Sequence, residues 1–451
     1  MPMAKEIKLR KGLDIRLKGV ANPVKKKPTT QKVFAVVPDD FYGIKPKVTV
    51  HEGDKVLVGD ALFVSKQNEE LKVVSPVSGV IEHINRGERR KVLSIEIVSD
   101  GKQEAKDFGK KSVQDMDAAS VKAFLLETGM FAFMKMRPYD VTAVPTDEPK
   151  AIFVSAFSKM PLSADFSFVV KGQETCFLKG LEALSKIAKV YLGISPEQKG
   201  LFDSVSKDVE VTIFDGPNPS GNVGVQINHL SPVNKGEVVW TIGAEEVIFI
   251  GRVVLTGKVD LTRTIAVAGS EVKEPVYVDT PIGIAVKDLL AGNLKKQDHV
   301  RIINGNPLVG SKTNIDGYLG AKVTEACVIP EGDDIDEVLG WIRPRFNQFS
   351  VNRSYFSWLQ GKKSYDLDAR IKGGQRHIIM SGEYDRVFPM DIFAGYLIKA
   401  ILVGDIDRME QLGIYEVAPE DFAVAEFVDS SKLELQRIVR EGLDMLRKEM
   451  S

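Results

Sequence analysis

The chain has 451 residues, which is more than one compact core accommodates and predicts several folding units. Hydrophobic residues make up 43% of it and charged residues 27%, the mixture of an ordinary globular protein. Lys and Arg number 61 against 62 Asp and Glu, so no net field favours nucleic acid as a partner. The two cysteines, Cys176 and Cys327, stand in no paired motif, which excludes a disulfide framework and all-cysteine iron-sulfur ligation.

The N-terminus carries charges every few residues and lacks the apolar stretch of a signal peptide, so we expect an intracellular protein. The most apolar region, residues 238–255, is interrupted by Glu245, Glu246 and Arg252. It is therefore not predicted to span a membrane. Residues 1–32 are interpreted as an irregular N-terminal segment, and its basic run at 25–27 as a solvated linker.

Residues 33–100 consist of short β-rich runs broken by glycine, with Gly53, Gly59 and Gly79 expected at turns. The segments VTVHEGDKVLVGDALF and SPVSGVI resemble the biotinyl/lipoyl barrel-sandwich domain. Carrier versions of that domain hold a swinging arm on a lysine at an exposed hairpin tip. The tip position falls on Asn68 here and Lys66 lies two residues away, so the module is expected to be structural.

Residues 101–251 begin with a helical stretch at about 115–128 and then alternate between strand and helix signals. The strand-like segments are AIFVSAF, VYLGI, VEVTIFD and EEVIFIG, and CFLKGLEALSKIA has the spacing of an amphipathic helix. This alternation predicts a Rossmann-like α/β domain with a parallel sheet.

Residues 252–330 return to a β pattern with one helix, which suggests a small β-grasp (SLBB-like) unit. Residues 331–451 combine a loop-rich segment with helical patterns at 390–402, 405–412 and 431–450, so a C-terminal helical bundle is expected. The chain is thus predicted to be a multidomain α/β protein.

A basic and aromatic stretch at the start of the C-terminal segment is a candidate protein interface, because arginine and aromatic side chains are the usual anchors. It comprises Arg343, Arg345, Phe346, Phe349, Arg353, Tyr355, Phe356 and Trp358.

Two glycine-rich runs are poor matches to a phosphate-binding loop. Residues 251–258 have the wrong glycine spacing and are interpreted as a strand and turn, and residues 305–313 as a β-turn. A third run, FDGPNPSGNVG, follows a convincing strand, but Pro217 and Pro219 each remove a backbone donor that a phosphate would need. The five histidines form no zinc-binding spacing, so a metal site is not expected.

Several segments together resemble the NqrA family, which forms one component of the Na+-translocating NADH:quinone oxidoreductase. They are IKLRKGLDIRLKG, the barrel-sandwich, ETGMFAFMKMRPYDV, FDGPNPSGNVG with SPVN, and GEYDRVFPMDI. The resemblance implies a peripheral subunit on the cytoplasmic side of a six-subunit membrane complex that oxidises NADH, reduces quinone and exports Na+. It also implies that NADH, flavins and iron-sulfur centres are bound by the partner subunits and none by this chain.

Relatives of that family hold FMN and NADH on a glycine-rich loop, whose equivalent here is MFAFMKMRP. Bulky side chains there would block close backbone approach. We hypothesise that any quinone contact uses this segment, because aromatic side chains stack on a ring while a cation donates to a carbonyl oxygen. The candidate contact residues, for quinone or a partner protein, are Phe131, Phe133, Met134, Lys135 and Arg137.

Two other classes of protein also agree with the sequence. A free-standing NAD- or flavin-dependent oxidoreductase would use the α/β region around Gly216, Gly221 and Gly224. A carrier protein would be acylated or biotinylated on Lys66.

Overall fold

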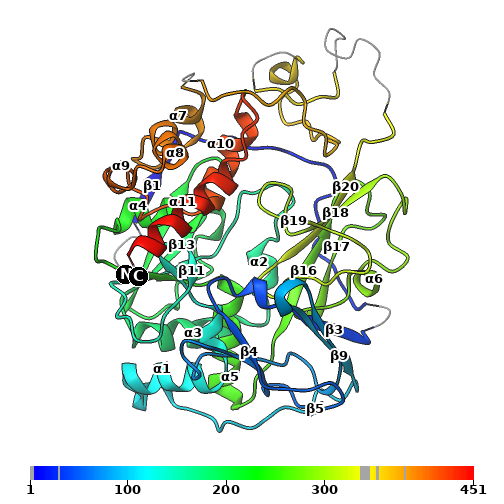
Figure 1. Cartoon of the computed structure of the whole chain (residues 1–451), viewed down its shortest axis with the longest axis vertical. Coiled ribbons are helices and arrows are strands. Elements are labelled where there is room, and N and C mark those ends of the chain that lie inside the picture. The colour runs from blue at the N-terminus through cyan, green and yellow to red at the C-terminus, as the bar shows by residue number, and fades with distance from the viewer. Residues whose placement is uncertain (1–4, 29–30, 336–345, 352–354, 380–381, 451) are drawn as a thin grey trace.

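A seven-stranded sheet forms the centre of the α/β unit (Figure 1). The computed structural model describes residues 5–28, 31–335, 346–351, 355–379 and 382–450. The strands of this sheet, in spatial order, are β1 (Lys5–Lys8), β14 (Val209–Asp215), β13 (Val190–Ile194), β12 (Ile152–Ser155), β15 (Val239–Thr241), β10 (Lys135–Arg137) and β11 (Val141–Thr142). The first five strands are parallel to one another, and β10 pairs antiparallel with both β15 and β11, which confirms the predicted parallel α/β domain.

Both faces of this sheet are covered, as a parallel sheet requires. Side chains of β12 alternate between two cores: Ile152 and Val154 face α3 (Glu174–Ser185) and α5 (Ala244–Thr256), while Phe153 faces α4 (Val223–Leu230) and the C-terminal helices. Helix α1 (Ala118–Glu127) lies within the stretch predicted at 115–128. The period-two alternation of a strand therefore determines which unit each residue contacts.

The segment EEVIFIG lies in helix α5, so its prediction as a strand was wrong. Ten of the helix's residues are buried, Glu245 and Glu246 among them. The helix therefore has no exposed polar face whose period would distinguish it from a buried strand. Residues 251–258 are accordingly the end of α5 and its cap at Gly257, with φ 74°, rather than a strand and turn. The helix continues across the domain boundary expected between residues 251 and 252.

The N-terminal segment is not irregular throughout. It contributes β1 to the edge of the large sheet and β2 (Lys25–Lys26) to the edge of the β-grasp sheet. Lys25 forms an ion pair with Asp279 at 3.2 Å, and Lys26 pairs with Glu274. The basic run is exposed to solvent, as predicted, but Lys25 and Lys26 form an edge strand rather than a plain linker. A strand this short has no periodicity that a sequence pattern can detect.

The barrel-sandwich is built from two small antiparallel sheets. One contains β3 (Val33–Val36), β9 (Val92–Ser99), β8 (Gly79–Arg86) and β5 (Lys55–Val56), and the other contains β4 (Pro46–Val48), β6 (Ala61–Ser65) and β7 (Lys72–Val74). Gly53 and Gly59 occupy turns with φ near 90°, as predicted. Gly79 is instead the first residue of a strand, where a Cβ would lie 2.0 Å from the Val98 carbonyl oxygen. Asn68 lies between β6 and β7, at the predicted tip.

The β-grasp unit is a six-stranded sheet with one short helix, α6 (Val286–Leu289). Its strands, in spatial order, are β19 (Ser311–Thr313), β18 (Val300–Asn304), β20 (Glu325–Pro330), β16 (Thr262–Ala268), β17 (Val276–Pro281) and β2. The run at 305–313 is the turn from β18 into β19, as predicted.

Helices of the C-terminal segment pack on the outer face of the large sheet, at the upper left of Figure 1. They are α7 (Glu383–Val387), α8 (Ala394–Val403), α9 (Ile406–Gln411), α10 (Ala423–Val428) and α11 (Leu435–Glu449). The three helices predicted from the sequence correspond to α8, α9 and α11. The arginines of the predicted interface, Arg343, Arg345 and Arg353, lie outside the described residues. In the part of the chain that is described, no helix combines the length and apolar character needed to cross a membrane.

Helices α3 and α5 pack closely because glycine lies at their crossing. A Cβ at Gly251 would lie 1.7 Å from the Cys176 carbonyl oxygen. We expect Gly251→Ala to lower the free energy of unfolding by about 1–3 kcal/mol through overpacking, measured by urea denaturation. Gly374→Ala is the control, since no atom lies within 4 Å of its Cβ position and its stability should stay unchanged. Equal stability of the two variants would contradict the close-packing argument.

Candidate functional site

A cavity of about 330 Å³ lies at the carboxyl ends of the parallel strands β12 and β15. This edge is where α/β sheets usually bind ligands. The α/β unit supplies most of the wall, the β-grasp unit adds Asn306, Val309, Lys322 and Thr324, and the C-terminal segment adds Glu420. Three folding units therefore meet around one space.

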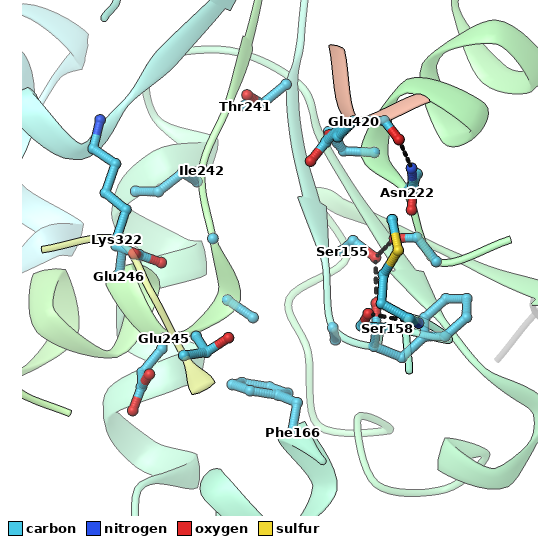
Figure 2. A pocket seen from close by; sticks show the side chains of 18 of the residues that line it. Ser155, Ser158, Phe166, Asn222, Thr241, Ile242, Glu245, Glu246, Lys322 and Glu420 are labelled. Atoms are coloured by element: carbon cyan, nitrogen blue, oxygen red, sulfur yellow. Dashed lines mark hydrogen bonds between the residues drawn. The ribbon is translucent and has the colours of Figure 1, made fainter. Parts of the chain in front are cut away.

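The α/β unit contributes side chains to both sides of the cavity. Figure 2 shows Ile242, Glu245, Glu246 and Lys322 on one side, and Ser155, Ser158, Asn222 and Glu420 on the other. Ser155, at the end of β12, donates through its hydroxyl to the Gly221 carbonyl oxygen at 2.7 Å, which fixes the loop before α4.

Three of the five predicted contact residues line the cavity: Phe133, Lys135 and Arg137. Lys135 and Arg137 are two residues apart on β10, so the strand's alternation places both on the same face. Phe131 and Met134 are fully buried elsewhere, and the ring centroid of Phe131 lies 5.2 Å from that of Trp240 in a T-shaped contact. The structure thus separates the predicted set into cavity residues and core residues.

Arg137 connects the cavity to the C-terminal segment. Its guanidinium is 1% exposed and donates to Asp421 Oδ2 at 3.2 Å and to Glu420 Oε1 at 3.4 Å. Burial by itself would raise the pKa of nearby Asp140, but Lys135 and Arg137 outweigh it and lower that pKa to about 2. The carboxylate of Asp140 therefore stays charged and holds Lys135 Nζ at 3.4 Å.

A second buried charge cluster connects the α/β and β-grasp units. Arg263 of β16 donates to Glu246 Oε1 at 2.5 Å, and Glu245 Oε1 accepts from the Thr264 backbone N–H at 2.6 Å. Both glutamates lie in the first turn of α5, where the helix dipole favours negative charge. Burial nevertheless raises the pKa of Glu245 to about 7, because it outweighs the attraction of Arg263.

Lys322 is a cavity residue that the sequence analysis missed. Its Nζ is buried, has no hydrogen-bond partner among the described residues, and lies 5.0 Å from the ring centroid of Phe41. Burial, reinforced by the charge of Lys135, lowers the pKa of Lys322 to about 7. Nothing in the sequence around it distinguishes this lysine from a surface residue, since the surroundings come from other folding units.

The glycines of FDGPNPSGNVG pack against other parts of the chain. A Cβ at Gly221 would lie 2.8 Å from the Phe157 carbonyl oxygen, and one at Gly224 would lie 2.2 Å from Asp421 Oδ2. The Asp421 carboxylate therefore lies against the first turn of α4, where a phosphate-binding loop would place its phosphate. A bound phosphate would meet this negative charge.

No group of three or more His, Cys, Asp or Glu residues that could hold a metal ion occurs in the described ranges. Cys327 is buried in the β-grasp unit, and Cys176 is half-buried in α3.

The modules of this chain define a class of protein: a barrel-sandwich, an α/β domain and an SLBB-type β-grasp unit in one chain. Three family descriptions match it: "NqrA N-terminal barrel-sandwich hybrid domain" over residues 7–100, "NqrA second alpha/beta domain" over 116–259, and "NQRA C-terminal domain" over 264–314. The chain belongs to the NqrA family of the Na(+)-translocating NADH-quinone reductases.

Curated relatives extend over the whole length. The chain is similar to the NqrA subunits of the Na(+)-translocating NADH-quinone reductases of Yersinia pestis at 33% identity, Saccharophagus degradans at 34% and Serratia proteamaculans at 35%, each over 98% of this chain and 100% of the relative. Two solved structures of an NAD+-reducing [NiFe]-hydrogenase are similar at 12% and 11% identity. They cover 42% and 48% of this chain and 41% and 50% of theirs, with TM-scores of 0.31 and 0.34, too low to support any argument.

The raised pKa of Glu245 predicts a pH-dependent stability. A carboxyl whose pKa is higher in the folded state contributes stability that is present below the unfolded pKa of 4.5 and is lost as pH rises through about 7. Between about pH 5 and pH 8, the free energy of unfolding of the wild type should fall by about 2–3 kcal/mol more than that of Glu245→Gln. Urea denaturation at several pH values measures this difference.

The control for this experiment is Glu70→Gln, because Glu70 is exposed in the barrel-sandwich. The free energy of unfolding of Glu70→Gln should change with pH in the same way as that of the wild type. A Glu245→Gln profile that also coincides with the wild type would contradict the assignment.

Proposed function

We propose that this chain is the peripheral NqrA subunit of a Na+-translocating NADH:quinone reductase, located on the cytoplasmic side of the membrane, and that its cavity binds the quinone ring. Family membership over nearly the whole chain supports the first part. The observation that carries the second part is that Phe133, Lys135 and Arg137 line a single cavity.

The chemistry of the cavity suits a neutral ring with carbonyl groups. Phe133, Phe166 and Ile242 provide apolar surface, and Lys135 provides a donor. Its volume of about 330 Å³ falls in the range of small-molecule sites. A quinone ring is apolar on its faces and accepts hydrogen bonds only at its carbonyl oxygens, so it matches an apolar wall with a few donors.

Redox cofactors are assigned by this proposal to the partner subunits: NADH, flavins and iron-sulfur centres. The Asp421 carboxylate beside Gly224 disfavours a phosphate at the start of α4. Phe131 and Phe133 occupy the short segment after α1 with large side chains, where a cofactor-binding loop needs close backbone approach. The chain then serves assembly and quinone binding, and electron transfer belongs to the complex.

The subunit role predicts that membrane proteins co-purify with this chain. Solubilising native membranes in mild detergent, capturing the chain and identifying its companions by mass spectrometry should recover membrane-embedded flavoproteins in fixed proportion. The isolated chain should show no flavin absorbance. A lone protein that carries flavin would instead support the free-standing NAD- or flavin-dependent oxidoreductase.

The quinone site predicts a specific loss of affinity. Lys135→Met removes a half-buried donor from the cavity wall, so the affinity for a soluble benzoquinone should fall about tenfold. Calorimetry on the full chain measures this change. Lys106→Met, which changes an exposed lysine between the barrel-sandwich and α1, is the matched control and should leave the affinity unchanged.

Phe131→Ala tests the division between core and cavity residues. Phe131 is completely buried against Trp240, so its truncation should lower the stability by about 3–5 kcal/mol. In the fraction that remains folded, quinone affinity should be close to that of the wild type.

Unchanged affinity in both Lys135→Met and Phe133→Leu would refute the quinone site.

A further inference from the structure

One carboxyl group that lines the cavity has no part in the quinone contact argued above. Glu420 lies in the short helix η7 (Pro419–Phe422) of the C-terminal segment. Its side chain is 40% exposed, although that of Asp421 beside it is completely buried. Figure 2 shows the Glu420 side chain directed from η7 into the space between the two sides of the cavity. Glu420 therefore presents a carboxyl group to whatever occupies this space.

Two hydrogen bonds hold Glu420 in place. Its backbone carbonyl oxygen accepts from Asn222 Nδ2 at 3.1 Å, which connects η7 to the residue before α4. Its Oε1 accepts from the Arg137 guanidinium at 3.4 Å, a long distance for a charge-assisted hydrogen bond. Its Oε2 has no hydrogen-bond partner among the described residues. The carboxyl group is thus positioned by the chain and still has an oxygen available to a ligand.

Lys135 supplies the opposite chemistry in the same cavity. Its side chain is 39% exposed, and its positive charge acts on the Glu420 carboxyl group. The cavity therefore offers a ligand one donor and one acceptor. A quinone ring has two carbonyl oxygens, which only accept hydrogen bonds, whereas the reduced ring, a hydroquinone, has two hydroxyl groups, which also donate. Only the hydroquinone can bind to both side chains when the carboxyl group is ionised.

We propose that the Glu420 carboxylate accepts a hydrogen bond from a hydroxyl group of the hydroquinone, so that this cavity binds the reduced ring more tightly than the quinone. The inference rests on the proposed function, because it requires the ring to bind in this cavity. A hydrogen bond to a carboxylate is about twice as strong as one between neutral groups. A quinone carbonyl oxygen would instead meet a negative charge. Tighter binding of the reduced form raises the two-electron reduction potential of the bound ring, by about 30 mV for each tenfold difference in affinity.

The preference for the hydroquinone depends on the protonation of Glu420. Burial raises the pKa of this carboxyl group to about 7. The negative charges of Asp421 in η7 and Asp140 after β10 add to the rise in pKa. The positive charges of Arg137 and Lys135, both on β10, oppose it without cancelling it. Below this pKa the neutral carboxyl group can donate to a quinone carbonyl oxygen, and above it the carboxylate only accepts. The preference for the hydroquinone should therefore grow as pH rises through about 7.

The test measures two probes by calorimetry on the full chain under nitrogen: a dimethoxy-methyl-benzoquinone and the corresponding hydroquinone. At about pH 8 the wild type should bind the hydroquinone about tenfold more tightly than the quinone. Glu420→Leu should lower the hydroquinone affinity about tenfold more than the quinone affinity, which removes the preference. Glu420→Gln keeps an acceptor of the same shape but does not ionise, so part of the preference should remain and its pH dependence should disappear.

Glu441→Leu is the matched control, because it removes an exposed carboxylate of α11 that pairs only with Arg437 on the same helix. Its ratio of the two affinities should equal that of the wild type. Urea denaturation shows whether Glu420→Leu is folded. If it is not, the pH dependence of the ratio in Glu420→Gln decides the question.

Each outcome supports or overturns the proposal. A wild type that binds both forms equally, or the quinone more tightly, would overturn it while the quinone site stands. An equal loss of both affinities in Glu420→Leu would show that Glu420 only holds the cavity together, and would overturn it as well. A ratio that still changes with pH in Glu420→Gln would assign the preference to another group. If the wild type binds neither probe, the quinone site itself is wrong and the proposal fails with it. A hydroquinone preference that Glu420→Leu removes and Glu420→Gln partly keeps supports the proposal.

Discussion

Two buried arginines hold the folding units of this protein together, and the rest of the structure depends on them. Arg263 joins the β-grasp unit to Glu245 and Glu246 at the start of α5. Arg137 joins the large sheet to Asp421 in the C-terminal segment. Each guanidinium is at most 1% exposed, so losing a partner would leave a charge in an apolar interior, a cost of about 3–5 kcal/mol.

These charge clusters also determine which charged groups line the cavity. Glu245 and Glu246 lie at the start of α5, and Asp421 lies against the start of α4, so the chain places its own carboxylates where each helix dipole would attract an anion. Both helix ends border the cavity. A space whose helix ends carry the chain's own carboxyl groups, and whose other walls are largely apolar, suits a neutral acceptor better than a phosphate ester.

Much of the architecture could be predicted from sequence, because the turns of the barrel-sandwich and the alternation of strands and helices leave local patterns. The exceptions have physical causes. Helix α5 is buried on all sides, so EEVIFIG has no polar face to indicate its period. Of the candidate site, Lys135 and Arg137 could be identified because they lie close together in the segment of the family resemblance. Lys322 could not, since its environment is created by Phe41 and Asp40 from far along the chain.

The pairing of β1 with β14 has a consequence for synthesis. Lys5 pairs with Thr212, so a strand near the start of the chain finds its place only after most of the α/β unit has left the ribosome. Until then β1 has no neighbouring strand, and its unpaired backbone groups are the kind of surface on which strands of other chains assemble. Production of this protein is therefore sensitive to anything that delays its N-terminal segment, including a bulky fusion at that end.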